Sequence, residues 1–417
     1  MLPFDFAALL LFLAAALGLV NHRWIGMPQP ISLLIGALVL SLGIAAVDQF
    51  LPGLGLPELA RGTLKAADLS HVLLDGMLAF LLFAASLEVD LEELRTSKWA
   101  ILGLATVGVI LSTLIFGLLI WLAFVAAGAP VPILWCFVLG AVLAPTDAVA
   151  VHGLLRRVPL PPALKAAITG ESLFNDGVGV VIFLIALAGA QGARGLVGHG
   201  AVAAALVSQG VGGALLGLAT GYLAALALRR VDNHNLELIM SLALVLVTFR
   251  LADAVGTSGP IAVVTAGLVI GQEIRRMASN AAPRDHITTF WSMMDELLNA
   301  LLFLLIGFEI LVIEPDRIHL LPILASFLFA LCARSVSVAI PLAFLYPRMQ
   351  EMRRDVAMLT WTGLRGGVSV AFALMLPESP YRSELLAVCY AVVVFTVIVQ
   401  GLTVPMVARA LLRTGPR

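Results

Sequence analysis

Charged residues are scarce in this sequence, and their scarcity excludes a whole class of fold. Asp, Glu, Lys and Arg make up 12% of the 417 residues, whereas hydrophobic residues make up 61%. A soluble domain has about 25% charged residues, and a chain of this composition has too few polar side chains to cover a surface in water. The composition therefore predicts a protein that crosses a lipid bilayer several times.

Cysteine and net charge are also in short supply. The three cysteines, Cys136, Cys332 and Cys389, lie within apolar runs and show no metal-binding spacing, which favours packing over a disulfide framework or a metal site. The net charge of −1 gives no reason to expect nucleic acid as a partner. No nucleotide-binding motif is present, and we expect no cofactor. The N-terminal apolar run lacks a basic leader and a small-residue cleavage site, which predicts a retained helix rather than a signal peptide.

What the sequence has in quantity is long apolar runs. Thirteen can be delimited, and most approach the ~20 residues that a helix needs to cross a bilayer. Their Leu, Val and Ala content favours helices over barrel strands, which alternate polar and apolar residues. The segments are 3–20, 28–47, 71–89, 99–127, 131–154, 163–190, 200–228, 236–252, 257–272, 290–313, 320–346, 355–376 and 384–408. The sequence thus predicts an all-α polytopic membrane protein, with one transmembrane domain over 1–417 and no soluble regulatory domain.

The Lys and Arg residues predict the orientation of these segments. They are concentrated in the loops that follow odd-numbered segments, such as the loop with Arg156 and Arg157, and are few in the even-numbered loops. Because cytoplasmic loops carry the excess of Lys and Arg, we expect the N-terminus outside and the C-terminus in the cytoplasm of a bacterial inner membrane.

A weak internal repeat divides the chain. The sequence 81–89 in the third segment (LLFAASLEV) lines up with 302–310 in the tenth (LFLLIGFEI). An offset of seven segments predicts two inverted six-helix repeats, over 1–190 and 236–412, joined by a connecting helix at 200–228. Inverted repeats are typical of secondary transporters.

The sixth segment holds the sharpest cluster of polar residues, Gly170-Glu171-Ser172-Leu173-Phe174-Asn175-Asp176-Gly177. Charges at mid-bilayer cost roughly 2.5–3.5 kcal/mol each, so they need a reason. At helical spacing Ser172 and Asp176 share one face, and Glu171 and Asn175 share another. A carboxylate beside neutral oxygens suits a hard monovalent cation, and the flanking glycines allow another helix to approach closely.

Two further segments are interrupted at mid-span. In the fifth, Pro145 precedes Thr146 and Asp147, and a proline displaces a backbone carbonyl from the helix ladder. Freed carbonyls at membrane depth are tolerated where they line a cavity or bind an ion. We therefore expect Thr146 and Asp147 to complete a site that faces Asp176; a simple proline kink with a buried, protonated Asp147 is the alternative.

The twelfth segment is the counterpart of the fifth in the proposed repeat. Gly363, Gly366 and Gly367 surround Arg365 there and weaken the helix. Interrupted helices in matching positions of two halves indicate a transport site. Arg365 is expected to supply fixed positive charge near the crossing, together with the partial charges of the half-helix ends.

The remaining buried charges have structural interpretations. Arg334 stands alone in the eleventh segment, and Glu171 is its most plausible counter-ion, which leaves Asp176 free to titrate. Asp75 and Asn299, which lie toward the beginning of the third and tenth segments, are interpreted as a structural pair across the bundle. His152 is expected to pack or to cap rather than to relay protons.

At these residues the chain resembles a known family. Glu171–Gly177, Pro145–Ala148 and Gly363–Gly366 resemble the signature segments of the monovalent cation:proton antiporter family, which includes bacterial NhaP-type proteins and animal sodium–proton exchangers. The resemblance extends over nearly the whole chain. It implies a crossed pair of unwound helices, here the fifth and twelfth, in a homodimer.

The resemblance also implies roles for individual residues. Asp176 matches the aspartate that binds ion and proton, with Asn175 beside it. The family's cation-coordinating positions match Asp147, Ser172 and the backbone of Thr146. A structural ion pair of the family matches Glu171 and Arg334. An Asn-Asp pair is similar to the electroneutral branch, with one proton exchanged per cation. Many prokaryotic members have a glutamate in the third helix where this chain has Ala84, so we expect water to complete the coordination.

The mechanism that follows is competition between H⁺ and Na⁺ (or Li⁺) for Asp176, driven by an existing ion gradient rather than by ATP. A K⁺/H⁺ antiporter of the same fold is the first alternative, because Ala84 leaves the cation preference open. An intramembrane aspartyl protease that uses Asp147 and Asp176 is the alternative from another class. Against the protease, no Gly-x-Gly-Asp segment occurs in the sequence.

Overall fold

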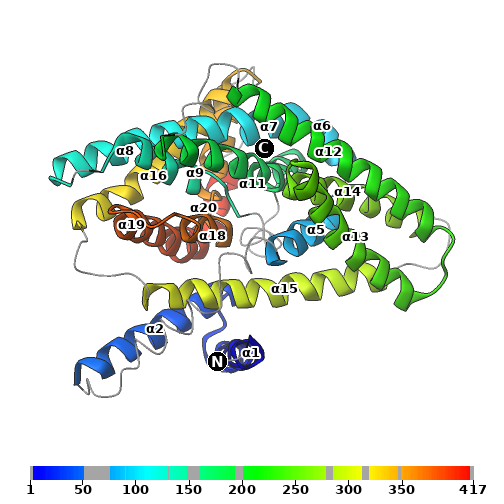
Figure 1. Ribbon diagram of the computed structural model, residues 1–417, viewed down its shortest axis with the longest axis horizontal. Coiled ribbons are helices and arrows are strands. Elements are labelled where there is room, and N and C mark those ends of the chain that lie inside the picture. The colour runs from blue at the N-terminus through cyan, green and yellow to red at the C-terminus, as the bar shows by residue number, and fades with distance from the viewer. Residues whose placement is uncertain are drawn as a thin grey trace.

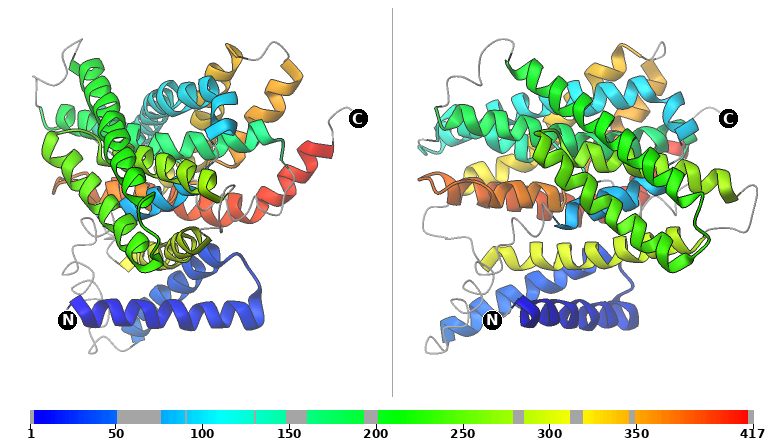
Figure 2. Two further views of the ribbon diagram at one scale, coloured as in Figure 1. Left: turned by 90° about the vertical axis from the view of Figure 1, so that its right-hand side faces the viewer. Right: turned by 45° about the vertical axis from the view of Figure 1, so that its right-hand side comes forward.

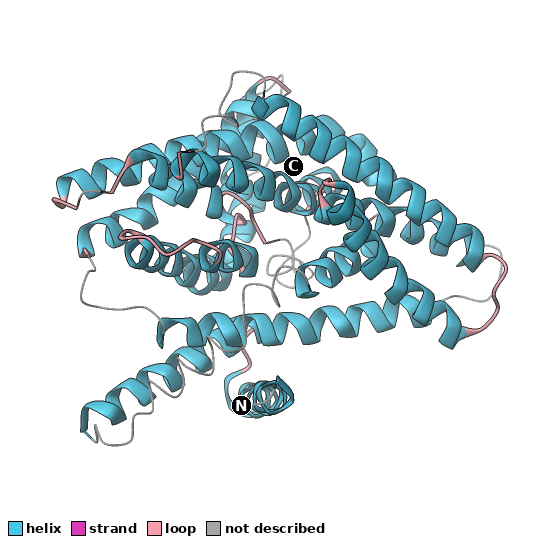
Figure 3. Ribbon diagram, viewed as in Figure 1, coloured by secondary structure: helices cyan, strands magenta, loops and turns pink. Residues whose placement is uncertain are grey.

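The computed structural model describes residues 3–50, 76–89, 91–129, 131–147, 160–192, 201–278, 285–311, 319–345 and 349–413. Within these ranges the chain is helical and contains no strand, as Figure 3 shows. The predicted all-α class is therefore confirmed. The long helices pack into one bundle, with α1 and α2 along one side of it and the N-terminus and C-terminus well apart (Figures 1 and 2).

The first half of the chain contains the helices α1 (Pro3–Val20), α2 (Gln29–Phe50), α5 (Leu78–Glu88), α6 (Leu91–Thr96), α7 (Lys98–Gly103), α8 (Val109–Ala126), α9 (Ile133–Val142), α11 (Pro162–Ala190) and α12 (Ala201–Leu228). The second half contains α13 (His234–Val255), α14 (Gly259–Ala278), α15 (Asp285–Phe308), α16 (Leu320–Ala343), α17 (Met349–Trp361), α18 (Gly367–Leu374), α19 (Arg382–Phe395) and α20 (Gly401–Arg413). Short π-helical or 3₁₀ stretches adjoin some of them, namely η1 (Asn21–Ile25), η4 (Leu104–Gly108), η5 (Glu309–Leu311) and η7 (Thr396–Gln400).

Each predicted apolar segment overlaps at least one of these helices. Among the described residues, eight helices are long and apolar enough to cross a membrane, and α5 and α9 are shorter apolar helices. The division into thirteen spans and into two inverted repeats stays a prediction. Several helices extend past the predicted ends, and α15, for example, begins at Asp285 rather than at 290. A helix that emerges from lipid can continue into polar residues, which a search for apolar runs does not count.

Close helix contacts depend on small residues. Gly213, Gly217 and Gly221 form a stripe on α12 that packs against α14, and a Cβ at Gly217 would lie 2.0 Å from the carbonyl oxygen of Ala262. Without a hydrophobic driving force in lipid, such backbone-to-backbone approach is a main source of helix association. The outward faces of the bundle expose apolar side chains such as Leu215 and Leu223, as expected for a surface that contacts lipid.

Candidate functional site

A non-helical stretch that follows α9 and another that separates α17 from α18 touch inside the bundle. α9 ends at Val142, and Pro145, Thr146 and Asp147 follow without helical structure. α17 ends at Trp361 and α18 begins at Gly367, with an irregular stretch between them. The amide of Asp147 donates a hydrogen bond of 2.8 Å to the carbonyl of Leu364. The two non-helical stretches therefore meet at one crossing, joined by a backbone hydrogen bond.

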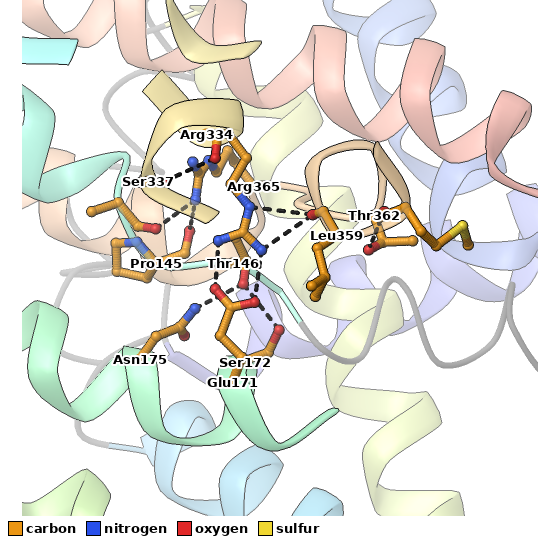
Figure 4. A network of polar contacts seen from close by, with 12 residues as sticks. Pro145, Thr146, Glu171, Ser172, Asn175, Arg334, Ser337, Leu359, Thr362 and Arg365 are labelled. Atoms are coloured by element: carbon orange, nitrogen blue, oxygen red, sulfur yellow. Dashed lines mark hydrogen bonds and ion pairs between the residues drawn. The ribbon is translucent and has the colours of Figure 1, made fainter. Parts of the chain in front are cut away.

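Arg365 holds this crossing together. Its Nη1 donates to the carbonyls of Ala144, at 2.5 Å, and Pro145, at 2.8 Å. Its own amide donates to Oγ1 of Thr396 at 3.1 Å. The helix ladder no longer satisfies the carbonyls near the proline, so a buried guanidinium with five donors is a suitable partner for them. Arg365 is 3% exposed, and its charge lies beside the stretch that follows α9 (Figure 4).

The middle of α11 presents a polar face to the same crossing. The hydroxyl of Thr146 lies 2.9 Å from that of Ser172 and accepts a hydrogen bond of 2.7 Å from Nδ2 of Asn175. Figure 4 shows these three side chains together, with Thr146 on the extended segment and the other two on α11. Gly179 lets α11 approach, because a Cβ there would lie 2.4 Å from Cγ of Pro145. The predicted close approach along the glycines of α11 is thus present in the structure.

A cavity with a volume of about 30 Å³ lies beside this face, which is room for about one or two water molecules or one small cation. Its polar lining consists of Asp147, Ser172, Asp176 and Asn299. Asp176 is 7% exposed, and its Oδ1 is buried without a hydrogen-bond partner. Buried polar atoms are nearly always paired, so an orphaned carboxylate oxygen at a cavity indicates a place where a ligand completes the structure.

Asp147 reaches the cavity from the non-helical stretch that follows α9. Its carboxylate packs against the backbone of Gly366, where a Cβ would lie only 1.7 Å from Oδ2. Gly366 is the N-cap of α18, and the N-terminus of a helix carries partial positive charge that favours an anion. A glycine is required here because any side chain would occupy the position of the carboxylate.

Glu171 faces away from the cavity and is fully paired. Its two carboxylate oxygens accept hydrogen bonds from Nη1 and Nη2 of Arg334, the second at 2.7 Å, in a bidentate ion pair. Arg334 also donates to the carbonyl of Leu359. Both charged side chains are buried. Gly363 makes room for the guanidinium, since a Cβ there would lie 2.6 Å from Nε of Arg334.

Comparison with known proteins identifies the family of this chain. Residues 8–410 match the family model described as "Sodium/hydrogen exchanger, transmembrane". The chain belongs to the sodium/hydrogen exchanger family. It is 39% identical to the Na⁺/H⁺ antiporter NhaP of Pseudomonas aeruginosa, over 97% of this chain and 96% of that protein. It is 30% identical to the Na⁺/H⁺ antiporter NhaH of Halobacillus dabanensis, over 95% and 96% of the two chains.

A solved structure has the same fold. The sodium proton antiporter MjNhaP1 from Methanocaldococcus jannaschii superposes with a TM-score of 0.77 at 20% identity, over 99% of both chains. Membership of the exchanger family makes the protein a multi-pass membrane transporter rather than an enzyme. The aspartyl-protease alternative and the K⁺/H⁺ alternative receive no support from these relatives.

The exchanger also shows a cavity residue that sequence reasoning missed. Asn299 was expected to be a structural partner of Asp75, which, like His152, lies outside the described residues. In the structure Asn299 lines the cavity on α15, its Nδ2 donates to the carbonyl of Asp295 at 2.8 Å, and its Oδ1 is buried without a partner. Its polar side chain within an apolar helix was the available signal.

The position that faces the cavity on α5 also differs from the one singled out in the sequence. Ala84 packs in an apolar cluster with Phe83 and Val263, whereas Ala85, one residue later, lines the cavity. Successive helical residues point about 100° apart, so an offset of one residue changes the face. Neither alanine supplies an oxygen, and α5 therefore contributes no side-chain ligand at this cavity.

Proposed function

We propose that this exchanger moves one Na⁺ or Li⁺ in exchange for one H⁺, and that the two compete for Asp176. The observation that carries the proposal is the orphaned, buried Oδ1 of Asp176 at a cavity that also holds Asp147 and Ser172. Oxygen ligands of this kind suit a hard cation. The name of the Pseudomonas relative, a Na⁺/H⁺ antiporter, supports Na⁺ as the cation.

The cation is coordinated by the carboxylates of Asp176 and Asp147, the hydroxyl of Ser172 and one backbone carbonyl. Arg365 already binds the carbonyls of Ala144 and Pro145, so we assign the carbonyl of Thr146 to the cation. Water completes the coordination where Ala85 supplies nothing. Asn175 acts as a positioning residue, because its amide holds the hydroxyl of Thr146 toward α11.

Exchange is one for one because a bare carboxylate is costly to move within the bilayer. Either a proton or a cation neutralises Asp176, and the loaded site carries the same charge in both cases. The neighbouring position holds the neutral Asn175, and Glu171 is already paired with Arg334. No second carboxylate on α11 is then available to carry an extra proton, which favours electroneutral exchange.

The test is Asp176→Asn in proteoliposomes that contain a pH-sensitive dye. Addition of Na⁺ or Li⁺ to vesicles with the unaltered protein should change the internal pH, and the variant should give no signal above protein-free vesicles. Asp253→Asn is the matched control, because Asp253 is an exposed aspartate on α13 that forms an i,i+3 ion pair with Arg250. Exchange that persists in Asp176→Asn, with the control normal, would reject the assignment.

The same assay distinguishes the remaining points. Competition predicts that the apparent KM for Na⁺ rises as the pH falls, while the maximal rate at saturating Na⁺ is retained. Electroneutral exchange predicts rates that are insensitive to an imposed membrane potential. A response to K⁺ equal to the response to Na⁺ would instead favour the potassium alternative.

We extend the proposal to assembly and orientation. The resemblance to the antiporter family implies a homodimer, and the arginine-rich loops favour a cytoplasmic C-terminus and an external N-terminus in the inner membrane. Cross-linking in intact membranes should give a species of twice the 44.0 kDa chain mass. Single cysteines introduced near each terminus can be labelled with a reagent that does not cross the membrane. Labelling of the C-terminal cysteine, and not the N-terminal one, from outside would contradict the proposed orientation.

A further inference from the structure

Three metal-ligating side chains meet away from the crossing, where α13 and α15 begin. His234 is the first residue of α13, Glu237 lies one turn later, and His286 is the second residue of α15. The first turns of these helices lie side by side at one edge of the bundle (Figure 1). Positions three apart share a helix face, so His234 and Glu237 both face the start of α15.

The donor atoms of this cluster already lie close together. One ligand atom from each of His234, Glu237 and His286 can be chosen so that all lie within 4.8 Å of one another. Nε2 of His286 lies 2.8 Å from Oε2 of Glu237, and the two imidazole rings have centroids 4.1 Å apart. The first turn of α13 is fixed by its N-cap, since Oδ1 of Asn233 accepts from the amide of Leu236.

Burial within the cluster is graded. The side chain of Glu237 is 1% exposed and that of His286 is 22% exposed, whereas His234 lies on the surface. A buried carboxylate gives the cluster a fixed base, and the exposed imidazole leaves a path for an ion from solvent. The open side also leaves room for a water molecule as a further ligand.

The donor set selects a type of ion. Two imidazoles and one carboxylate with an open position are a known ligand set for Zn²⁺, with metal–ligand distances of about 2.0–2.2 Å. In a tetrahedral site these distances place neighbouring donor atoms about 3.3 Å apart. The hydrogen bond between His286 and Glu237 therefore needs to open only slightly. Imidazole suits Zn²⁺ and similar ions, whereas Na⁺ prefers oxygen, so this cluster is chemically unlike the transport cavity.

We propose that His234, Glu237 and His286 form a binding site for a divalent transition-metal ion such as Zn²⁺, with water as the fourth ligand. The ion would join the start of α13 to the start of α15. α15 is also the helix that carries Asn299 to the transport cavity, so a bound ion restrains a helix of that cavity at its polar end. Among the described residues, this is the one group of three such ligands.

The experiment titrates Zn²⁺ into the full-length protein, purified without a polyhistidine tag, in competition with a chromophoric chelator. One high-affinity ion per chain is expected, together with a rise in the thermal unfolding temperature, because a ligand that binds only the folded state stabilises it. Co²⁺ in place of Zn²⁺ should give the absorption bands of a tetrahedral site. His234→Ala should weaken binding by at least about tenfold, since even outer hydrogen-bond partners of a metal site cost 10–100-fold when removed.

His319→Ala is the matched control. His319 also contacts a glutamate, with Nδ1 3.1 Å from Oε1 of Glu384, but it belongs to no three-ligand group among the described residues. This variant should retain the affinity of the unaltered protein. His234 is exposed, so its replacement should leave the fold intact. Normal Na⁺/H⁺ exchange by His234→Ala without added Zn²⁺ checks that the variant is folded. No stoichiometric binding, or binding that is unchanged in His234→Ala, would overturn the proposal and leave the cluster as a simple His–Glu hydrogen bond.

Discussion

Two carboxylates on α11, five residues apart, are both buried and yet have opposite surroundings. Glu171 is 1% exposed and Asp176 is 7% exposed. Glu171 accepts two hydrogen bonds from Arg334 in a bidentate pair, whereas Oδ1 of Asp176 has no hydrogen-bond partner and faces a cavity. Burial alone therefore does not distinguish a carboxylate with a structural role from one that is proposed to bind an ion. The partner does, because a carboxylate with a permanent cation cannot exchange ligands at low cost.

The difference also explains why the helix tolerates two charges at membrane depth. The pair of Glu171 and Arg334 links α11 to α16, and Arg334 continues to the carbonyl of Leu359 at the end of α17. Three helices around the crossing are thereby joined by charge-assisted hydrogen bonds, which are the strong ones. Beside this fixed frame, Oδ1 of Asp176 is buried without a hydrogen-bond partner.

The largest expected effect comes from breaking the ion pair between Glu171 and Arg334. Arg334→Ala leaves Glu171 buried without its cation, and loss of one partner of a buried pair costs about 3–5 kcal/mol. The free energy of unfolding, measured by titrating SDS into detergent-solubilised protein, should fall by that amount. Expression in membranes should fall with it.

A double replacement sharpens the result. Glu171→Met with Arg334→Met removes both charges, and apolar replacement of a whole buried pair is often neutral for stability. The double variant should recover most of the free energy lost in Arg334→Ala and should retain Na⁺-driven pH changes. If Arg334→Ala were as stable as the unaltered protein, Glu171 would have another partner, and the contrast with Asp176 would fail.

Asp147 offers an intermediate case, because its carboxylate packs against the N-cap of α18. Gly366→Ala would place a Cβ 1.7 Å from Oδ2 of Asp147, so the carboxylate must move away from the cavity. We expect the KM for Na⁺ to rise about tenfold, equivalent to about 1.4 kcal/mol, with little change in stability. Gly210→Ala is the control, since a Cβ at Gly210 meets nothing within 4 Å. Equal KM values for the two variants would remove Asp147 from the cation site.

Much of the fold could be predicted because lipid imposes one simple constraint. A bilayer requires apolar helices, and their positions are visible as runs of hydrophobic residues. The ends were less visible, because α13 and α15 continue into polar residues at His234 and Asp285. The two histidines of the metal-ligand cluster, His234 and His286, lie on those extensions, outside the apolar segments 236–252 and 290–313, and the two helices are separated along the chain.

The candidate site was predicted from the free-energy cost of charges at mid-bilayer rather than from hydropathy. A charge at mid-bilayer is stable only with a partner, and the pairing of Glu171 with Arg334 left Asp176 as the carboxylate available to bind a proton or a cation. The sequence could not show which face of α5 meets α11, so Ala84 was considered in place of Ala85, the residue that lines the cavity. Side-chain direction depends on how the helices rotate against one another, and packing determines that rotation.

Replacement of Asn299 is expected to have the smallest effect, and it tests whether an unpaired oxygen without a negative charge is enough to bind the cation. It resembles Asp176 in having an oxygen that is buried without a partner at the cavity, yet it is neutral and its amide is held by the carbonyl of Asp295. If the orphaned oxygen is what marks a cation ligand, Asn299→Ala removes one neutral interaction of about 1 kcal/mol, and the KM for Na⁺ should rise about fivefold at an unchanged maximal rate. Glu296→Ala, at an exposed position one turn earlier on α15, should leave both constants unchanged. An unaltered KM in Asn299→Ala would show that a lone oxygen at the cavity is not enough, and that the negative charge of Asp176 and Asp147 alone selects the cation.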